Sequence, residues 1–345
     1  MKRIPASSLQ ATQALQLVSD LQQRFVQSLE SRSKALHCSQ SFTAVEWLRD
    51  EGTHGGGIRF ETTDGTMIGR GSVNVSQVHY DDNPNKKLGS ATAISTIIHP
   101  VNPLSPSVHI HISWTEMKSG EGYWRMMADL NPAIENKDAT LQFAIAMKKT
   151  LSTQADKAVE QGETYFYIPV LERHRGVSHF YLEEYHTDDK TADFNLAKAF
   201  GESAIDTYVN ILKNSLEQNV STVSSDKNRQ LAYHTLYFFQ VLTLDRGTTT
   251  GLLVHNQNDV GIMGSLPAYV DCNLLQSWVT KMPAPQGMLL QKLIDALPTI
   301  SPCLIDENTK QKLAQVVREH YHAYPDAIQM QATGHSIPAT VDNHQ

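Results

Sequence analysis

Residues 46–79 read EWLRDEGTHGGGIRFETTDGTMIGRGSVNVSQVH, with three consecutive glycines directly before Ile58-Arg59. Glycine lets the backbone adopt positive φ and lets other groups approach closely, so we expect residues 53–59 to form a tight loop that leads into strands. The stretch has no G-x-x-x-x-G-K-[ST] pattern and no strand-to-helix pattern that would aim a helix N-terminus at an anion, which argues against a phosphate loop. Arg59 just beyond the glycines is a first pointer to an anionic ligand.

Strand patterns continue along the chain. Residues 92–99 (TAISTIIH) are mostly apolar, as in a well-buried strand, and residues 108–115 (VHIHISWT) alternate, as in a strand with two unlike faces. Residues 164–168 and 177–185 are predicted as two further strands.

A hairpin is expected further on. Residues 234–244 and 250–254 flank a predicted turn at Asp245-Arg246-Gly247. Residues 255–259 (HNQND) then form a hairpin-like loop before residues 260–264.

Helical periodicity appears in blocks. Residues 9–29 are amphipathic, and further helices are predicted at 137–161, 192–216, 288–297 and 308–322. Because the strands are adjacent in sequence and the helices come in blocks, we expect an α+β fold. In it, residues 45–270 form one antiparallel sheet, covered by the N-terminal helix and the helices at 137–161 and 192–216.

The domain organisation predicted from these patterns is a single unit over residues 1–345, since no repeat and no Pro-, Gly- or Ser-rich linker divides the chain. It comprises an N-terminal helix (1–40), a sheet core with helices (46–270), C-terminal helices (280–325) and a polar, loosely held tail (326–345).

Composition limits the partners. The net charge of −7 and a pI of about 6.1 argue against nucleic acid or an anionic membrane surface as the main partner. No apolar run is long enough for a membrane span, and the N-terminal residues lack the apolar core of a signal peptide. Cys38, Cys272 and Cys303 are far apart in sequence and fit no zinc spacing, so we expect unpaired thiols and a cytoplasmic location.

Four segments, taken in order, resemble the oxygen-dependent coproporphyrinogen III oxidases of haem synthesis. The first is the glycine stretch with Arg59 and VNVSQVH. The second, STIIHPVNP followed by PSVH (residues 95–109), is similar to the family's S-L-V-I-H-P-x-N-P…P-T-x-H. The third, Arg175-Gly176 followed by FYLEE (180–184), resembles R-G-[IV]-G-G-x-F-F-D-D. The fourth, LDRGT…GL closing at SLP (244–267), resembles Y-D-R-G-T-x-F-G-L…M-S-L-P.

This resemblance implies a large antiparallel sheet flanked on both faces by helices, in a homodimer. The implied reaction converts two propionates of coproporphyrinogen III to vinyls, giving protoporphyrinogen IX. Dioxygen is the co-substrate, and the resemblance implies no organic cofactor; we expect no metal. The partner is therefore a porphyrinogen-type small molecule, which needs a largely apolar cleft with cationic partners for its carboxylates.

The resemblance also implies roles for particular residues. His109 occupies the family's proton-donor position, and Ser95 that of a substrate-contacting serine. Glu183 and Glu184 stand where the family has paired aspartates, one of which holds the pyrrole N–H groups. Strand alternation allows only one of the two to face a cleft, and we favour Glu183, which shares a face with His179 and Tyr181.

Other family positions have changed. His111 and Ser113 replace an asparagine and an arginine, and residues 255–259 lack the arginine of the family's G-G-R loop. The substrate-binding candidates are therefore Arg59, Ser95, His111, Ser113, Arg175, His255, Asn256 and Gln257, with Arg125 and Arg173 as further sources of positive charge. We expect Arg59, Ser95, His109, one of the paired glutamates and residues 245–259 to line one cleft.

Two alternatives stay open. Because two guanidinium groups are missing, the chain fits a non-catalytic tetrapyrrole-binding homologue, or an enzyme for a different carboxylated substrate. His109 and His111 on one strand face, with His99 or a glutamate, are also compatible with a metal site.

Overall fold

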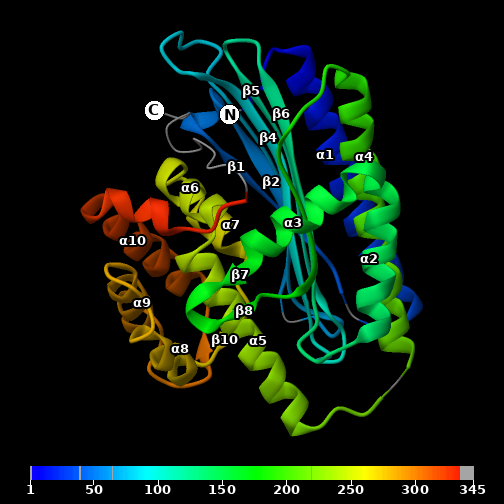
Figure 1. The fold of residues 1–345 in the computed structure, drawn as a ribbon, viewed down its shortest axis with the longest axis vertical. Helices are drawn as coiled ribbons and strands as arrows, with labels where there is room; N and C mark the ends of the chain where they lie inside the picture. Colours follow the sequence, from blue (N-terminus) through cyan, green and yellow to red (C-terminus); the bar gives the residue numbers. More distant parts are fainter. Residues whose placement is uncertain (1, 39, 64, 219, 335–345) are drawn as a thin grey trace.

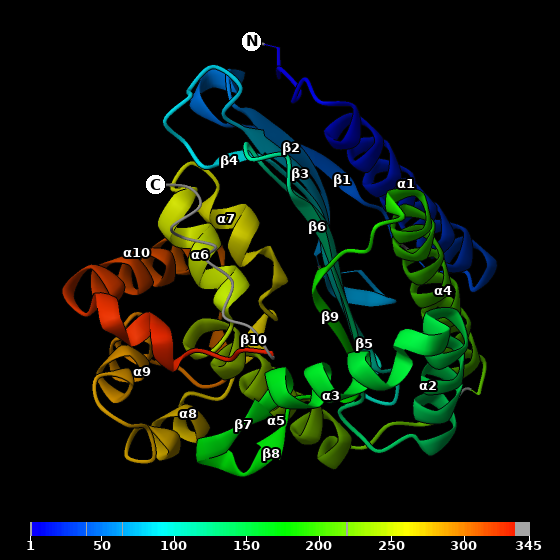
Figure 2. The same cartoon turned by 45° about the horizontal axis from the view of Figure 1, so that its top comes forward.

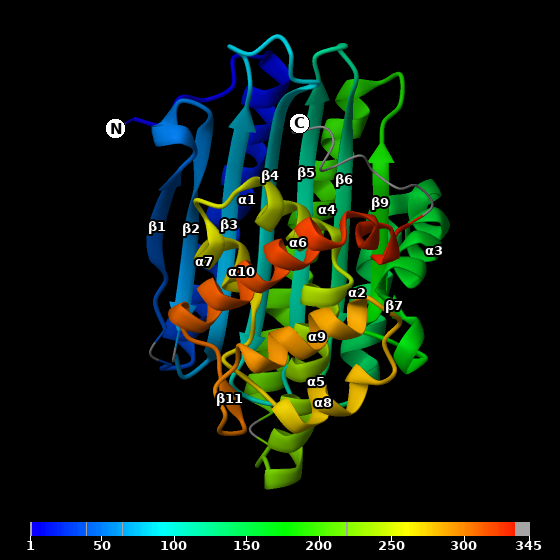
Figure 3. The ribbon, with the colours of Figure 1, turned by 90° about the vertical axis from the view of Figure 1, so that its left-hand side faces the viewer.

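The computed structural model describes residues 2–334 apart from 39, 64 and 219. Its centre is a seven-stranded antiparallel sheet in which only the last strand departs from consecutive numbering, as Figure 3 shows face-on. The strands are β1 Thr43–Leu48, β2 Gly55–Thr63, β3 Ile68–His79, β4 Leu88–Pro100, β5 Ser107–Met117, β6 Gly122–Asn131 and β9 Val177–Tyr185. The predicted α+β class is confirmed.

The three glycines are part of a strand and not of the predicted loop. They open β2, between β1 and β3, and Gly55 and Gly56 have φ of 92° and 143°. A Cβ at Gly55 would lie 2.2 Å from the Gln77 carbonyl oxygen, and one at Gly56 would lie 2.2 Å from that of Trp47. Only glycine fits here, because the neighbouring backbones approach on both sides.

One face of the sheet packs against α1 Leu9–Ala35, α2 Lys137–Leu151 and α4 Lys190–Glu217 (Figure 1). The Ser8 side chain caps α1 by accepting from the Ala11 N–H, and Asp189 caps α4 in the same way. The apolar stripes of these helices join the inward-facing strand residues in the larger of the two main hydrophobic cores. This face is therefore a closed structural layer.

The opposite face is covered by the second half of the chain (Figure 2). The helices there are α5 Ser224–Thr243, α6 Arg246–Val254, α7 Asp259–Ile262, α8 Cys272–Val279, α9 Gln286–Asp295 and α10 Glu307–Ala323. Their apolar side chains form the second core, which touches the sheet through Ile97. Helices thus flank both faces, and α9 and α10 confirm the two helices predicted near the C-terminus.

The segment predicted as a hairpin is helical, which corrects the prediction that the sheet continues to residue 270. In α5 every residue from Thr235 to Thr243 is buried, so this half of the helix is enclosed on all sides, as in a helix inside a core. The turn at Asp245-Arg246-Gly247 is instead the start of α6, where Asp245 accepts from the Thr248 N–H. Apolar residues crowd this segment so densely that alternation could not separate strand from helix.

The helix predicted at 137–161 is broken. Ser152 has φ 49°, and the chain restarts as α3 Ala155–Phe166, which packs beside β9. The strand predicted at 164–168 is therefore wrong, since residues 164–166 belong to α3. Only the short β7 Tyr167–Ile168 remains, paired with β8 Arg173–His174.

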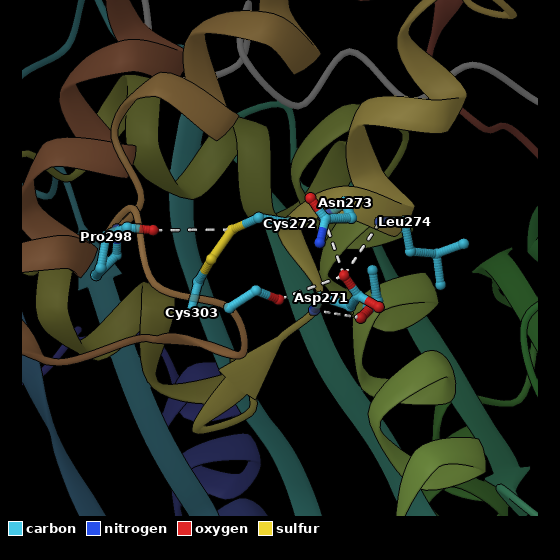
Figure 4. The surroundings of a disulfide bond; sticks show 8 residues. Asp271, Cys272, Asn273, Leu274, Pro298 and Cys303 are labelled. Atoms are coloured by element: carbon cyan, nitrogen blue, oxygen red, sulfur yellow. Dashed lines mark hydrogen bonds between the residues drawn. A yellow bond between two sulfur atoms is a disulfide. The ribbon is translucent and has the colours of Figure 1, made fainter.

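The C-terminal part contains a pairing that the sequence did not indicate. β10 Tyr269–Val270 pairs with β11 Cys303–Leu304, and Cys272 forms a disulfide with Cys303 (Figure 4). The prediction of three unpaired thiols is therefore wrong, and Cys38 alone is a free cysteine.

The tail prediction is partly wrong. Residues 325–330 form a 3₁₀ helix, and Gln331 is buried, while residues 335–345 lie outside the described residues. Within the described part of the chain, none of the helices has the length and apolar composition that a membrane span requires.

Candidate active site

A cavity of about 270 Å³ lies between the sheet and helices α5, α6 and α7. Alternate residues of β3, β4, β5 and β6 form its floor, because side chains two apart on a strand share a face. Residues of α5, α6 and α7, among them Tyr237, Arg246 and Ile262, form its roof together with Asn258 just before α7. A larger cavity of about 650 Å³, beside α1 and α4, contains Glu184 but no other predicted site residue. The chemistry-bearing groups therefore converge in the smaller cavity.

A hydrogen-bonded row of ionisable side chains lies at one end of this cavity. His109 and Asp129 face each other across β5 and β6, and His109 Nδ1 is 2.8 Å from Asp129 Oδ1. The other Asp129 oxygen accepts from Arg175 Nη2 at 2.7 Å and from Asn131 Nδ2 at 2.6 Å. Burial alone would raise the pKa of Asp129, but Arg175 and His109 hold that pKa well below its usual range. The ionised carboxylate fixes the ring of His109, whose Nε2 then remains for a ligand.

Arg175 is held rigidly. Its guanidinium carbon lies 4.4 Å from the centre of the Phe166 ring and 4.8 Å from that of Tyr237, and Nη1 donates to Gln240 Oε1 at 2.9 Å. Stacking and charge pairing together keep the buried cation in place.

The paired glutamates face opposite sides of the sheet. Glu183 lines the cavity and Glu184 lines the larger cavity behind it. Glu184 has φ 49° at an irregularity in the β6–β9 register, so the chain is strained at this point. Glu183 is the glutamate favoured from the sequence, and it shares the cavity with His109.

Glu183 lies in a polar but enclosed setting. Its Oε1 accepts from the Tyr181 hydroxyl at 2.5 Å and lies 3.5 Å from Arg125 Nη2. Burial raises the pKa of Glu183, and Arg125 and Tyr181 oppose that shift without cancelling it. Arg125 stays charged, because Tyr181 and Glu183 offset the cost of its burial and leave its pKa above the usual value. A carboxyl with a raised pKa suits proton exchange with a ligand.

Polar neutral groups form the middle of the floor. Asn74, Ser95 and His111 are register partners on β3, β4 and β5, and all three line the cavity. Burial, with Arg125 and His109 nearby, lowers the pKa of His111 to about 3, so its ring is neutral near pH 7. Its Nε2 lies 3.1 Å from the Ser113 hydroxyl.

The turn before α6 adds a carboxylate and a cation. Asp245 Oδ1 accepts from the Tyr165 hydroxyl at 2.7 Å, and Arg246 Nη2 donates to the Ile328 carbonyl at 3.2 Å. Both residues line the cavity, as expected for the stretch 245–259, although neither was assigned an individual role. The D-R-G-T motif could have pointed to both residues. From the sequence it was expected in a hairpin turn, whereas it forms the start of α6.

Many lining groups have unsatisfied polar atoms. Within the described residues, these buried atoms have no hydrogen-bond partner: Trp47 Nε1, Asn74 Oδ1, Thr96 Oγ1, Arg125 Nε, Arg175 Nε, Glu183 Oε2 and Arg246 Nε. Native structures rarely leave buried polar atoms unpaired. Their concentration here indicates a site for a ligand that carries both acceptors and N–H donors.

The predicted residues divide into two groups. The structure brings together Ser95, His109, His111, Ser113, Arg175, Glu183 and His255. Arg59 is buried outside the cavity lining, where it donates to Glu61 at 2.7 Å. Asn256 and Gln257 are exposed, because residues 255–258 link two helices and do not form a hairpin over the site. Glu184 lies on the other sheet face.

Three further residues were missed or only suggested. Arg125 was considered only as a replacement cation and Asn258 only as part of the stretch 245–259, while Asp129 was assigned no role. Asp129 lies outside the four family motifs, so nothing in the sequence pointed to its carboxylate. Arg173 is exposed on β8 and does not reach the cavity lining.

The histidine metal site gains no support. In the described part of the chain, no three His, Cys, Asp or Glu side chains are grouped so that they could hold a metal ion. His99 is buried, accepting from the Ser107 hydroxyl at 3.0 Å and donating to the Ser265 carbonyl at 3.1 Å. Both of its ring nitrogens are therefore used within the protein.

Sequence comparison adds an independent finding. Residues 13–277 match the family model described as coproporphyrinogen III oxidase. The mitochondrial oxygen-dependent coproporphyrinogen-III oxidase of Rattus norvegicus is 28% identical over 251 residues, 66% of this chain and 56% of the rat protein. The oxygen-dependent coproporphyrinogen-III oxidase of Drosophila melanogaster is 26% identical over 302 residues, 80% of this chain and 75% of the fly protein. That of Prochlorococcus marinus (strain NATL1A) is 28% identical over 306 residues, 76% of this chain and 84% of its relative.

The match thus spans little more than half the length of the rat relative, and a larger share of the fly and cyanobacterial ones. The family model, however, covers most of the present chain, including every strand of the main sheet and helices α1 to α7 except the first turn of α1. The chain therefore belongs to the coproporphyrinogen III oxidase family.

Proposed function

We propose that the protein catalyses the oxygen-dependent oxidative decarboxylation of porphyrinogen propionates to vinyls, with coproporphyrinogen III as substrate and protoporphyrinogen IX as product. The observation that carries this proposal is the set of unpaired polar atoms around the cavity. Three are arginine Nε–H donors, which suit carboxylates, and one is a Glu183 oxygen, which suits a pyrrole N–H.

The cavity residues would divide the work as follows. Arg125, Arg175 and Arg246 would hold propionates, while Glu183 and Asp245 would accept from pyrrole N–H groups. His109, fixed by Asp129, would exchange a proton near the reacting propionate through Nε2. The enclosed setting strengthens each of these interactions relative to water. No residue other than those lining the cavity or directly supporting them is needed for this scheme.

A second candidate function is tetrapyrrole binding without turnover, or action on another carboxylated substrate. It is favoured by one observation: two cavity arginines already have anionic neighbours, since Arg175 pairs with Asp129 and Arg125 lies near Glu183. Ser113 and His111 beside these arginines are neutral. The cavity therefore offers a ligand with four carboxylates fewer unpaired cations than the ligand has negative charges. We therefore expect turnover of coproporphyrinogen III to be slow.

The test is turnover by the purified protein in air with coproporphyrinogen III and no added metal. Oxygen consumption is followed with an electrode, and the product by porphyrin fluorescence after oxidation, with an anaerobic sample and His109→Ala as controls. Product above the no-enzyme blank that requires oxygen and His109 supports the proposal. Porphyrin binding without product favours tetrapyrrole binding without turnover, and absence of both leaves only action on another carboxylated substrate.

We also propose a homodimer, as the family resemblance implies, built from a single-domain chain. Light scattering behind a sizing column distinguishes a dimer from a monomer of 38.5 kDa. One cooperative unfolding transition, seen equally by fluorescence and circular dichroism, is the result expected for a single domain.

A further inference from the structure

Residues 331–334 form a short strap after α10 and its following 3₁₀ helix, Pro325–Met330. In Figure 2 the red segment runs from α10 across to the sheet. The strap lies outside residues 13–277, which match the family model.

The strap is anchored to the turn that carries Asp245 and Arg246. The Ala332 N–H donates to the Leu244 carbonyl at 2.9 Å, and Gln331 Nε2 donates to the Tyr321 hydroxyl at 3.0 Å and also to Thr249. Just before the strap, the Ile328 carbonyl accepts from Arg246. The chain end is thus fixed to the roof of the cavity by directed hydrogen bonds.

At its far end the strap reaches Glu183. A Cβ placed at Gly334 would lie 2.9 Å from Glu183 Oε2 and 3.5 Å from the Tyr181 ring. Ala332 packs against the cluster formed by Met127, Tyr165, Phe166 and Tyr181. The Gly334 N–H acts to lower the pKa of Glu183, against the larger effect of burial. A side chain at position 334 would therefore have to displace the Glu183 carboxylate or the strap itself.

We propose that the strap completes the site by positioning Glu183, with Gly334 as a positioning residue that acts through the carboxylate. This inference rests on the proposed function, in which Glu183 accepts from ligand N–H groups. With the strap in place, Glu183 is confined between Tyr181, Arg125 and the Gly334 backbone, which lies against its Oε2. Displacing the strap frees the side chain to turn toward solvent and weakens its hold on a tetrapyrrole.

The test is a double-mutant cycle on the affinity for coproporphyrin III, the stable oxidised form of the substrate. Affinity is measured by quenching of tryptophan fluorescence. Gly334→Leu is expected to weaken binding about tenfold in the otherwise unchanged protein, and less than about twofold when Glu183 is already replaced by Gln. Gln329→Ala, an exposed change just before the strap, is the matched control and leaves the affinity unchanged.

Thermal melting shows whether Gly334→Leu folds, and the smaller Gly334→Ala change gives a weaker effect in the same direction if it does not. Equal losses with and without Glu183→Gln, or no loss in either background, overturn the role of the strap while the proposed function stands. If the unchanged protein binds no porphyrin, the proposed function itself fails. The two failures are therefore distinguishable.

Discussion

His109 Nδ1 lies 2.8 Å from Asp129 Oδ1, across a register pair of two central strands. Asp129 is fully buried and lies between the imidazole and the Arg175 guanidinium. Because an ionised carboxylate can only accept, His109 must carry its proton on Nδ1 toward Asp129. The arrangement therefore selects one tautomer of the candidate proton donor.

Asp129→Asn tests this relationship. The amide no longer requires the Nδ1–H tautomer and leaves Arg175 without its counter-charge, so we expect the turnover rate to fall about 10²-fold or more. The free energy of unfolding should also fall by about 3 kcal/mol, because a buried cation loses its partner. Single-turnover kinetics and urea unfolding measure the two effects. Asp156→Asn, an exposed carboxylate in the first turn of α3, is the control. Turnover within about threefold of the original would contradict the assigned role.

The adjacent glutamates provide a matched pair. Glu183→Gln removes the cavity carboxylate and should lower the turnover rate about 10²-fold, whereas Glu184→Gln changes a residue on the other sheet face and should leave the rate within about twofold. Both variants lose the same charge from neighbouring positions, so a general electrostatic effect would lower both rates equally. An equal loss, or a loss confined to Glu184→Gln, would show that Glu183 is not the working carboxylate.

The central sheet was predictable because its strands alternate cleanly. Residues 108–115 place His109, His111 and Ser113 on one face and Ile110 and Ile112 on the other, and the structure has this arrangement. The four motifs, which occur in the same order as in the family, then indicated which family the chain resembles. Residues 234–264 lacked such a signal, because apolar residues occur there at both strand and helix spacings. Tertiary packing against the sheet decides in favour of helices.

The candidate site was predictable only where it lies on strands. Its roof comes from α5, α6 and α7, so expecting a hairpin there assigned Asn256 and Gln257 to the cavity and gave Asp245, Arg246 and Asn258 no individual role. The distance in sequence between Cys272 and Cys303 likewise gave no hint that β10 and β11 bring them together. That pairing also removes the argument from unpaired thiols for a reducing compartment.

His99 should make stability depend on pH. Burial, with the charge of His234 adding to it, lowers the pKa of His99 well below its usual value, so the folded protein keeps this ring neutral. The unfolded chain takes up the proton below about pH 6.5, and stability is therefore lost as the pH falls through that value. Between pH 7 and 5, urea unfolding of the unchanged protein should lose up to about 2 kcal/mol more than His99→Gln does.

His322→Gln, an exposed change on α10, is the control for this measurement and should follow the unchanged protein at every pH. Parallel pH curves for the unchanged protein and His99→Gln would mean that His99 does not titrate differently on folding.

Because of the disulfide, we predict a different number of reactive thiols from the three unpaired thiols expected from the sequence. Denatured without reductant, the oxidised protein should expose one reactive thiol, Cys38, and after reduction three. Since the bond closes a loop between residues 31 apart in sequence, its reduction should lower the free energy of unfolding by about 3 kcal/mol. Ellman titration and urea unfolding measure these effects, and Cys38→Ser should show no free thiol before reduction and the same loss of stability after it. Three reactive thiols before reduction, in protein purified under air, would show that Cys272 and Cys303 do not pair.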